Sequence, residues 1–179
     1  MTRSIRYFTF VLVLSFAGYS YAQPTVNKKD LPNFHQVNAS IYRGGQPTED
    51  GIRQLKSIGI KTIVSLRSAD GKAKREKNWA QDAGVSFVNV PLSNWFGPKD
   101  AKIEKILKLL NNSKNQPVFV HCKRGSDRTG TVIAVYRMTQ EGWTPKEASA
   151  EAKKFGIGWW QVWMKAYIHD YHRDHIAKN

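Results

Sequence analysis

The only cysteine of the 179-residue chain, Cys122, stands in the segment VFVHCKRGSDRTGT, residues 118–131. An apolar run typical of a strand precedes it, and a glycine-containing loop leads from it into a run typical of a helix. In that order, the N–H groups of the loop and of the first helical turn point into one concavity, which favours the binding of an anion. The same positive field lowers the pKa of a thiol from about 8.5 and holds it as the thiolate. The segment therefore predicts a nucleophilic cysteine beside a bound phosphate group.

The residues after Cys122 fit the transfer of a phosphoryl group to sulfur. Arg128 follows six residues later, and its planar guanidinium suits the oxygens of a phosphate group. Attack by the thiolate on phosphorus gives a phosphocysteine intermediate, which water hydrolyses in a second step. Thr129 is expected to donate a hydrogen bond to the sulfur when the sulfur leaves. Because this chemistry requires no metal or other cofactor, none is expected.

The spacing His-Cys-x-x-Gly-x-x-Arg-Thr-Gly, residues 121–130, resembles the signature of the cysteine-dependent protein tyrosine and dual-specificity phosphatase superfamily. Upstream, IYRGGQP (41–47) and LKSIGIKTIVSLR (55–67) resemble the opening of small atypical dual-specificity-like phosphatases, so the likeness covers roughly residues 33 to 155. The resemblance implies that Cys122 is the nucleophile and that Arg128 clamps the phosphate. The further residues expected to bind the phosphate are Lys123, Arg124, Gly125, Ser126 and Thr129.

The resemblance also implies a general acid that protonates the leaving oxygen from a loop before the cysteine. The corresponding stretch is PLSNWFGPKD, and Asn94, near the expected position, cannot act as this acid. Asp127 is the preferred candidate, because its place before the arginine resembles the loop of myotubularin-like lipid phosphatases. Asp100 is the second candidate, although it would also suit the start of a helix, and the absence of any protein acid is the third. Because Asn94 stands near the position where an acid is expected, a phosphate-binding module that has lost catalysis stays an alternative function for this chain.

The balance of charge favours anionic partners. Lys and Arg together number 28 against 14 Asp and Glu, a formal net charge of +14, which attracts phosphorylated substrates, nucleic acid or an acidic membrane surface. Lys123 and Arg124 add two cations that a single phosphate group does not need. We therefore expect a phosphorylated protein as the substrate, with an inositol polyphosphate or a phosphoinositide as the alternative, and we keep an anionic membrane surface as a candidate contact. Nucleic acid is disfavoured, because Trp160, Trp163 and Tyr167 have helical spacing and are expected to pack against the domain rather than stack on bases.

The N-terminus has the pattern of a secretory signal. Arg3 and Arg6 precede an apolar run over residues 7–17, and SYA at residues 20–22 suits cleavage after Ala22. We expect a signal peptide over residues 1–22, a polar tether over 23–32 and one phosphatase-like catalytic domain over 33–179. This organisation predicts export to a periplasm or out of the cell.

The apolar periodicity after the tether alternates between strand-like and helix-like runs. Strands are expected at residues 40–43, 61–66, 85–90 and 117–121, and helices at 48–56, 73–83, 101–110, 129–141, 144–155 and 159–172. Hydrophobic residues make up 41% of the chain, which excludes a disordered or low-complexity chain. The alternation predicts a single α/β domain with a central, mostly parallel sheet flanked by helices.

Overall fold

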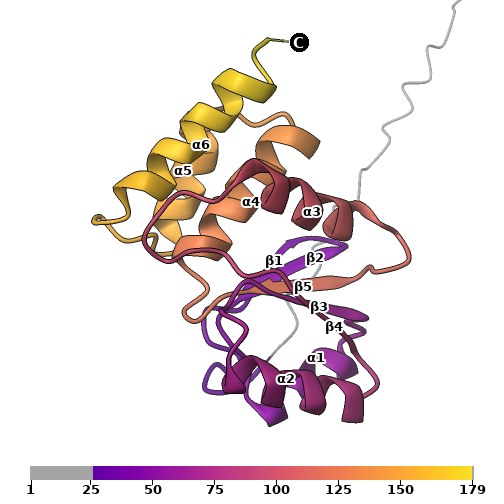
Figure 1. Ribbon diagram of the computed structural model, residues 1–179. Coiled ribbons are helices and arrows are strands. Elements are labelled where there is room, and N and C mark those ends of the chain that lie inside the picture. Colours follow the sequence, from indigo (N-terminus) through magenta and orange to yellow (C-terminus); the bar gives the residue numbers. More distant parts are fainter. Residues whose placement is uncertain (1–25, 179) are drawn as a thin grey trace, which may run out of the picture.

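One five-stranded sheet lies at the centre of the computed structural model, which describes residues 26–178 (Figure 1). The strand order is β1-β2-β5-β3-β4, and within this described range only β1 runs antiparallel to its neighbour. The predicted class, an α/β domain with a mostly parallel sheet, is thereby confirmed. The strands are β1 (His35–Asn38), β2 (Ile41–Gly44), β3 (Thr62–Ser65), β4 (Ser86–Asn89) and β5 (Val118–His121).

Helices cover both faces of the sheet. In Figure 1, α1 (Glu49–Ser57) and α2 (Gly71–Asp82) lie on one face, and the remaining helices lie on the other. None of the helices in residues 26–178 is long and apolar enough to span a bilayer. The helices of the second face are α3 (Asp100–Asn111), α4 (Asp127–Gln140), α5 (Pro145–Lys154) and α6 (Val162–His175).

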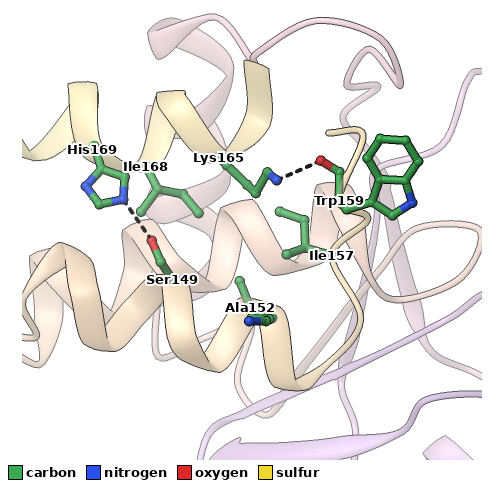
Figure 2. Close-up of a pocket in the computed structure, with 8 residues that line it drawn as sticks. Ser149, Ala152, Ile157, Trp159, Lys165, Ile168 and His169 are labelled. Atoms are coloured by element: carbon green, nitrogen blue, oxygen red, sulfur yellow. Dashed lines mark hydrogen bonds between the residues drawn. The ribbon is translucent and has the colours of Figure 1, made fainter. Parts of the chain in front are cut away.

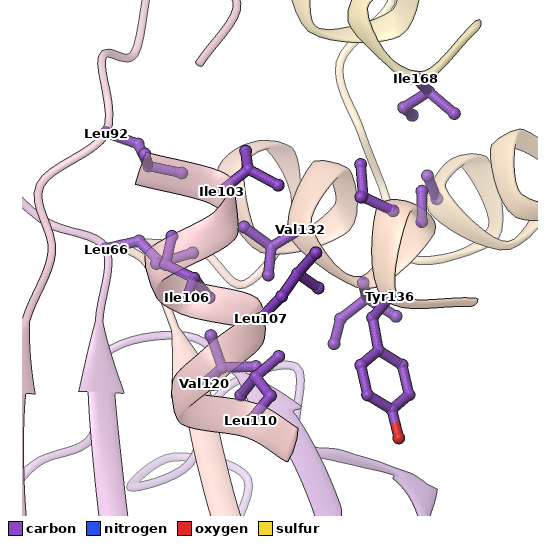
Figure 3. Close-up of a cluster of buried hydrophobic side chains, with 14 of the residues drawn as sticks. Leu66, Leu92, Ile103, Ile106, Leu107, Leu110, Val120, Val132, Tyr136 and Ile168 are labelled. Atoms are coloured by element: carbon purple, nitrogen blue, oxygen red, sulfur yellow. The ribbon is translucent and has the colours of Figure 1, made fainter. Parts of the chain in front are cut away.

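The alternation of side chains along the inner strands supplies both hydrophobic cores. Ile63 and Phe119 point to the core under α1 and α2, whereas Val64 and Val120 point to the core under α3, α4 and α6 (Figure 3). Because successive side chains of a strand point to opposite faces, a strand with helices on both sides is apolar at most of its positions. This arrangement explains the continuous apolar runs by which the inner strands were predicted.

Capping residues fix where two of the helices begin. The Thr48 hydroxyl accepts a hydrogen bond from the Gly51 N–H, and Thr144 forms a complete capping box with Glu147. Side-chain acceptors at these positions satisfy N–H groups that the helix leaves without partners. Both starts were predicted, but α6 begins at Val162 rather than at residue 159, because residues 158–161 form a turn closed by a hydrogen bond from the Gln161 N–H to the Gly158 carbonyl.

Two expectations are corrected by the packing. Residues 26–32 are not a tether, because Leu31 is fully buried in the core under α1 and α2 and the Pro32 carbonyl accepts a hydrogen bond from the Gly45 N–H at 2.7 Å. The apolar Leu31 is the reason, since burying it stabilises the packed conformation of this otherwise polar stretch. Strand β1, which pairs with β2, was not predicted. The expected signal peptide over residues 1–22 lies outside the described residues.

The inward face of α6 was also assigned wrongly. Trp160 and Trp163 are exposed, whereas Met164, Ile168 and Tyr171 are buried. The buried residues follow the spacing i, i+4, i+7, so they form a stripe on one side of the helix. Because nearly every residue from 157 to 168 is apolar or aromatic, the helical period alone does not identify which stripe faces the core. Tyr167 is partly buried against the core, as expected.

Candidate active site

The segment around Cys122 lies where three parallel strands end side by side. β5 ends at His121 between the ends of β2 and β3, and α4 begins at Asp127. The intervening residues, Cys122 to Ser126, are here called the catalytic loop. Carboxyl ends of parallel strands are the usual position for ligand sites in open α/β sheets. The predicted order of strand, loop and helix is confirmed.

The catalytic loop requires glycine at two places. Gly125 has φ +75°, and a Cβ on it would lie 2.4 Å from the Gly44 carbonyl carbon. The backbone of the loop therefore packs directly on Gly44, the last residue of β2, and on Gly45, and the Gln46 N–H donates to the Lys123 carbonyl at 3.2 Å. A Cβ on Gly45 would lie 3.2 Å from the Lys123 carbonyl oxygen, and a Cβ on Gly44 would lie 2.7 Å from the Phe119 ring, so the glycine pair permits this close packing.

The Cys122 thiol is 2% exposed, and its surroundings stabilise the thiolate. Burial by itself raises the pKa of this thiol. The hydroxyl and the N–H of Thr129, the positive charge of Arg128 and the N–H of Arg124 together outweigh burial, so that the pKa of Cys122 lies below its ordinary value. The buried Thr129 hydroxyl has no other partner among the described residues, and it contributes to the lowered pKa of Cys122. The structure thus has the features of an activated cysteine nucleophile.

Replacing Thr129 by valine is expected to raise the pKa of Cys122. The change keeps the volume of the side chain but removes the hydroxyl that donates to the sulfur. Because the thiolate is the reactive form, the rate of alkylation by iodoacetamide rises with pH through this pKa, and its midpoint should move to higher pH in the variant. Cys122 is the only thiol of the chain, so the measurement reports on this residue alone. An unchanged midpoint would show that the hydroxyl does not stabilise the thiolate.

Arg128 lies in the first turn of α4 and is 8% exposed. Its Nη1 donates to the Leu66 carbonyl at 3.4 Å, which directs the guanidinium across the end of β3. Its buried Nε has no hydrogen-bond partner among the described residues. A buried donor without a partner carries a desolvation cost that a phosphate oxygen would remove. The position therefore suits the predicted phosphate clamp.

A buried pair below the loop was not predicted. Glu76 of α2 and His121 are both fully buried, and Glu76 Oε1 lies 2.6 Å from His121 Nε2. The other oxygen of Glu76 accepts a hydrogen bond from the Gln46 side chain at 2.9 Å, and His121 Nδ1 lies 3.2 Å from the Cys122 carbonyl oxygen. Glu76 therefore positions His121, the residue that precedes Cys122. Its spacing from the buried Ala73 and Ala80, i, i+3 and i+7, is the signal that could have identified it.

Arg43 of β2 supports the catalytic loop from the other side and was also not predicted as a site residue. It is fully buried, its Nη2 donates to the Gly125 carbonyl at 2.9 Å, and its guanidinium lies 4.4 Å from the centre of the Phe155 ring. Burial lowers the pKa of Arg43 to about 10, while the negative charges of Glu151 and Cys122 oppose this change. Arg43 is thus a cation at neutral pH that lies behind the anion-binding loop.

The Asp127 carboxylate is buried and engaged on both oxygens. Oδ1 accepts a hydrogen bond from the Gly158 N–H at 2.8 Å, and Oδ2 accepts one from Arg124 at 2.6 Å. Two N–H donors, one on each oxygen, hold this carboxyl group in place. This geometry favours a positioning role, in which Asp127 ties the catalytic loop to the segment after α5. Its assignment as the general acid stays a prediction.

The two other residues considered for the acid have structural contacts. Asp100 begins α3 and accepts a hydrogen bond from the Tyr167 hydroxyl at 2.6 Å, and its second oxygen lies 3.0 Å from His175 Nε2. These contacts fasten α3 to α6. The Asn94 carbonyl accepts a hydrogen bond from the Gln161 side chain at 3.2 Å. The loop after β4 is therefore joined to the segment before α6.

The five residues expected to bind the phosphate differ in exposure. Lys123 and Arg124 are exposed, Ser126 is half-buried, and Gly125 and Thr129 are buried. Arg124 is held by Asp127 and lies 5.5 Å from the centre of the Trp160 ring. The structure thus places two cations on the outer side of the loop, with Cys122 at its base.

A separate cavity of about 380 Å³ lies where α6 crosses α5 (Figure 2). Lys165 donates to the Trp159 carbonyl at 2.8 Å across this cavity, and Ile157 forms part of its wall. The segment from Ile157 to Trp159 is therefore fixed from two sides, by Lys165 here and by Asp127 through the Gly158 N–H. This arrangement holds the exposed tryptophans beside the catalytic loop.

The α/β fold, the buried low-pKa cysteine and the arginine six residues later define a domain of the cysteine-dependent phosphatase type. The family model described as "DSP-PTPase phosphatase fused to NAD+ Kinase" matches residues 15–160. The chain belongs to this family of dual-specificity-type tyrosine phosphatase domains, and the predicted resemblance is confirmed.

Relatives and solved structures agree with this assignment. The chain is 30% identical over 127 residues to the dual specificity protein phosphatase TpbA of Pseudomonas aeruginosa (strain UCBPP-PA14). The matched residues make up 70% of this chain and 56% of that protein. The chain therefore spans about half the length of this relative. Its structure is similar to that of P. aeruginosa TpbA in complex with pTyr, with a TM-score of 0.67 and 25% identity over 82% of this chain and 87% of that one. It is also similar to the core catalytic domain of the PP-IP phosphatase SIW14 from S. cerevisiae in complex with citrate, with a TM-score of 0.69 and 25% identity over 82% and 89% of the two chains.

Proposed function

We propose that this protein is a phosphomonoester hydrolase that works through a phosphocysteine intermediate and needs no metal. The observation that carries the proposal is the buried Cys122, whose pKa is lowered, beside the unpartnered Nε of Arg128 in the first turn of α4. A nucleophile and an anion clamp placed together at a helix N-terminus suit attack on a phosphate group. A domain that only bound phosphate would not require the activated thiol.

The reaction follows from this geometry in two steps. The sulfur of Cys122 attacks phosphorus, the S–P bond forms, and the ester P–O bond breaks as the leaving oxygen departs with its electron pair and takes up a proton. In our prediction that proton comes from Asp127, and a good leaving group such as a phenolate needs it least. The oxygen of a water molecule then attacks phosphorus while the water gives up a proton to Asp127, the S–P bond breaks, and inorganic phosphate and the thiolate are released. Thr129 stabilises the thiolate as it leaves, and Arg128 balances the charge on the phosphoryl oxygens in both steps.

We propose a phosphorylated protein as the first substrate class and an inositol polyphosphate or a phosphoinositide as the second. The complex of TpbA with pTyr supports the first class. The exposed Lys123 and Arg124 at the loop, together with the similarity to a PP-IP phosphatase, support the second, because extra phosphates provide partners for extra cations.

A substrate panel tests both proposals. We would measure kcat/KM on a phosphotyrosine peptide, a phosphoserine peptide, a phosphoinositide and an inositol polyphosphate, with Cys122→Ser as the blank. A preference for the peptides by more than about tenfold, equivalent to about 1.4 kcal/mol of transition-state binding, would assign the first class. In the second class, Lys123→Ala should lower kcat/KM by a similar factor, whereas the exposed Lys61→Ala before β3 serves as the control. Turnover of none of the four, with no phosphocysteine trapped by rapid acid quenching, would contradict the proposed function.

We further propose that the protein is exported. The support is the pattern of two arginines, an apolar run and small residues that ends at Ala22. The mass of the protein recovered from the periplasm or the medium should correspond to a chain that begins at Gln23. Recovery from the cytoplasm alone, with the N-terminal segment intact, would contradict this proposal.

A further inference from the structure

The large hydrophobic side chains that the described residues expose are concentrated in two short segments. Trp95 and Phe96 lie in the loop before α3, and the others lie at residues 159–163, between α5 and the first turn of α6. These side chains are between 49% and 82% exposed. We call them the aromatic rim, which consists of Trp95, Phe96, Trp159, Trp160, Val162 and Trp163.

The two segments of the aromatic rim lie together and border the catalytic loop. The Gln161 side chain donates to the Asn94 carbonyl at 3.2 Å, and a Cβ on Gly97 would lie 3.3 Å from the Trp163 carbonyl oxygen. The catalytic loop touches the same surface, because the guanidinium of Arg124 lies 5.5 Å from the centre of the Trp160 ring. The aromatic rim is therefore one surface beside the catalytic loop.

The fold does not use the aromatic rim to build its core. Helix α6 packs inward through Met164, Ile168 and Tyr171, which leaves Val162 and Trp163 facing outward. Contiguous exposed apolar surface of this kind marks a contact with another molecule. Trp side chains in particular suit a boundary between water and an apolar phase.

The charges around the aromatic rim identify the kind of partner. Residues 91–99 and 156–167 contain no Asp or Glu, whereas Lys99 and Lys165 lie within them and Lys123 and Arg124 lie in the adjoining catalytic loop. The chain as a whole carries a formal charge of +14. The nearest carboxylates, Asp127 and Asp100, are held by protein donors, and a surface of tryptophans on which cations outnumber carboxylates is complementary to a bilayer that contains anionic lipids.

We propose that the aromatic rim inserts into the interface of an anionic membrane and holds the catalytic loop against its surface. The tryptophan rings lie at the level of the headgroups, and Lys123 and Arg124 face the lipid phosphates. Binding depends on this surface alone and not on turnover, so it is tested separately from the proposed phosphatase activity.

The experiment uses the full chain with vesicles of phosphatidylcholine alone or mixed with phosphatidylglycerol. All six tryptophans lie at or after Trp79, so quenching of their fluorescence by brominated lipids reports on the domain and not on the apolar N-terminal segment. We expect quenching and cosedimentation with the anionic vesicles that weaken as salt is added. Trp159→Ser combined with Trp163→Ser should lower the partition coefficient by at least tenfold, because both side chains are exposed and the fold does not need them.

A matched pair of charge variants tests the electrostatic part. Lys123→Glu should weaken binding to the anionic vesicles, whereas Lys61→Glu, an equal change of charge on an exposed residue before β3, should not. Circular dichroism of every variant checks that the fold is retained.

Four outcomes would overturn the proposal. They are the absence of vesicle quenching, equal quenching of the wild type and the double tryptophan variant, equal binding to neutral and anionic vesicles, and equal weakening by Lys123→Glu and Lys61→Glu. A self-association that the tryptophan changes abolish, seen by analytical ultracentrifugation without any binding to vesicles, would instead assign the aromatic rim to a contact between copies of this chain.

Discussion

Replacing Cys122 by serine is expected to reduce kcat/KM on any phosphomonoester by at least about 10⁴-fold, because removal of a catalytic nucleophile has effects of this size or larger. The serine hydroxyl is not ionised at neutral pH, so the thiolate that Thr129 and Arg128 stabilise has no equivalent in the variant. The change replaces sulfur by the smaller oxygen and leaves the catalytic loop and Arg128 in place. The variant should therefore still bind phosphate.

The measurement combines single-turnover kinetics with phosphate binding by calorimetry. Cys122→Ser should show binding within a few-fold of the wild type and no phosphoenzyme on quenching. Because the chain has no second cysteine, residual activity within tenfold of the wild type would mean that the nucleophile is not a thiol. Loss of both binding and fold would instead show that Cys122 is needed for the structure of the loop.

Replacing Glu76 by alanine is expected to lower the free energy of unfolding by about 2–5 kcal/mol. The change removes the acceptor for His121 Nε2 and for the Gln46 amide, and the imidazole is fully buried where no water replaces the carboxylate. His121 Nδ1 contacts the Cys122 carbonyl, so activity should also fall through a less ordered catalytic loop. The other buried residues of α2 are Ala73 and Ala80, so Glu76 supplies the polar contact between this helix and the site.

Chemical denaturation of three variants measures this effect. Glu76→Gln keeps the volume and one acceptor oxygen, and should lose less stability than Glu76→Ala. Glu104→Ala on α3 removes an exposed glutamate and should change stability by less than about 0.5 kcal/mol. If Glu76→Ala were as mild as Glu104→Ala, the pair with His121 would contribute nothing to the fold.

The sequence by itself determined the chemistry of the site. Cys122, Arg128 and the backbone of the phosphate-binding loop lie within one strand, loop and helix start, so local spacing is enough to bring them together. The apolar runs of β3 and β5 and the caps at Thr48 and Thr144 are also local signals, and they predicted the α/β class and most element boundaries.

The tertiary structure decided what supports and surrounds that site. Glu76 and Arg43 come from distant parts of the chain, and nothing local shows that Glu76 pairs with His121 or that Arg43 donates to the catalytic loop. The partner of a buried polar group is set by packing between elements, which sequence spacing does not encode. The contacts of Asp127 with Gly158 and Arg124 likewise depend on how the segment after α5 folds back.

The exposure of the aromatic rim was likewise decided by the tertiary structure and not by the sequence pattern. Residues 157–168 are apolar in almost every position, so a helical period fits several faces equally well, and the face with Trp160 and Trp163 was wrongly assigned to the core. Only the docking of α6 through Met164 and Ile168 selects the inward face. The local order of strand, loop and helix thus determined which reaction the catalytic loop suits. Long-range packing determined which side chains hold the catalytic loop in place and which side chains face outward. The reason is that burial is a property of the assembled layers rather than of any one segment.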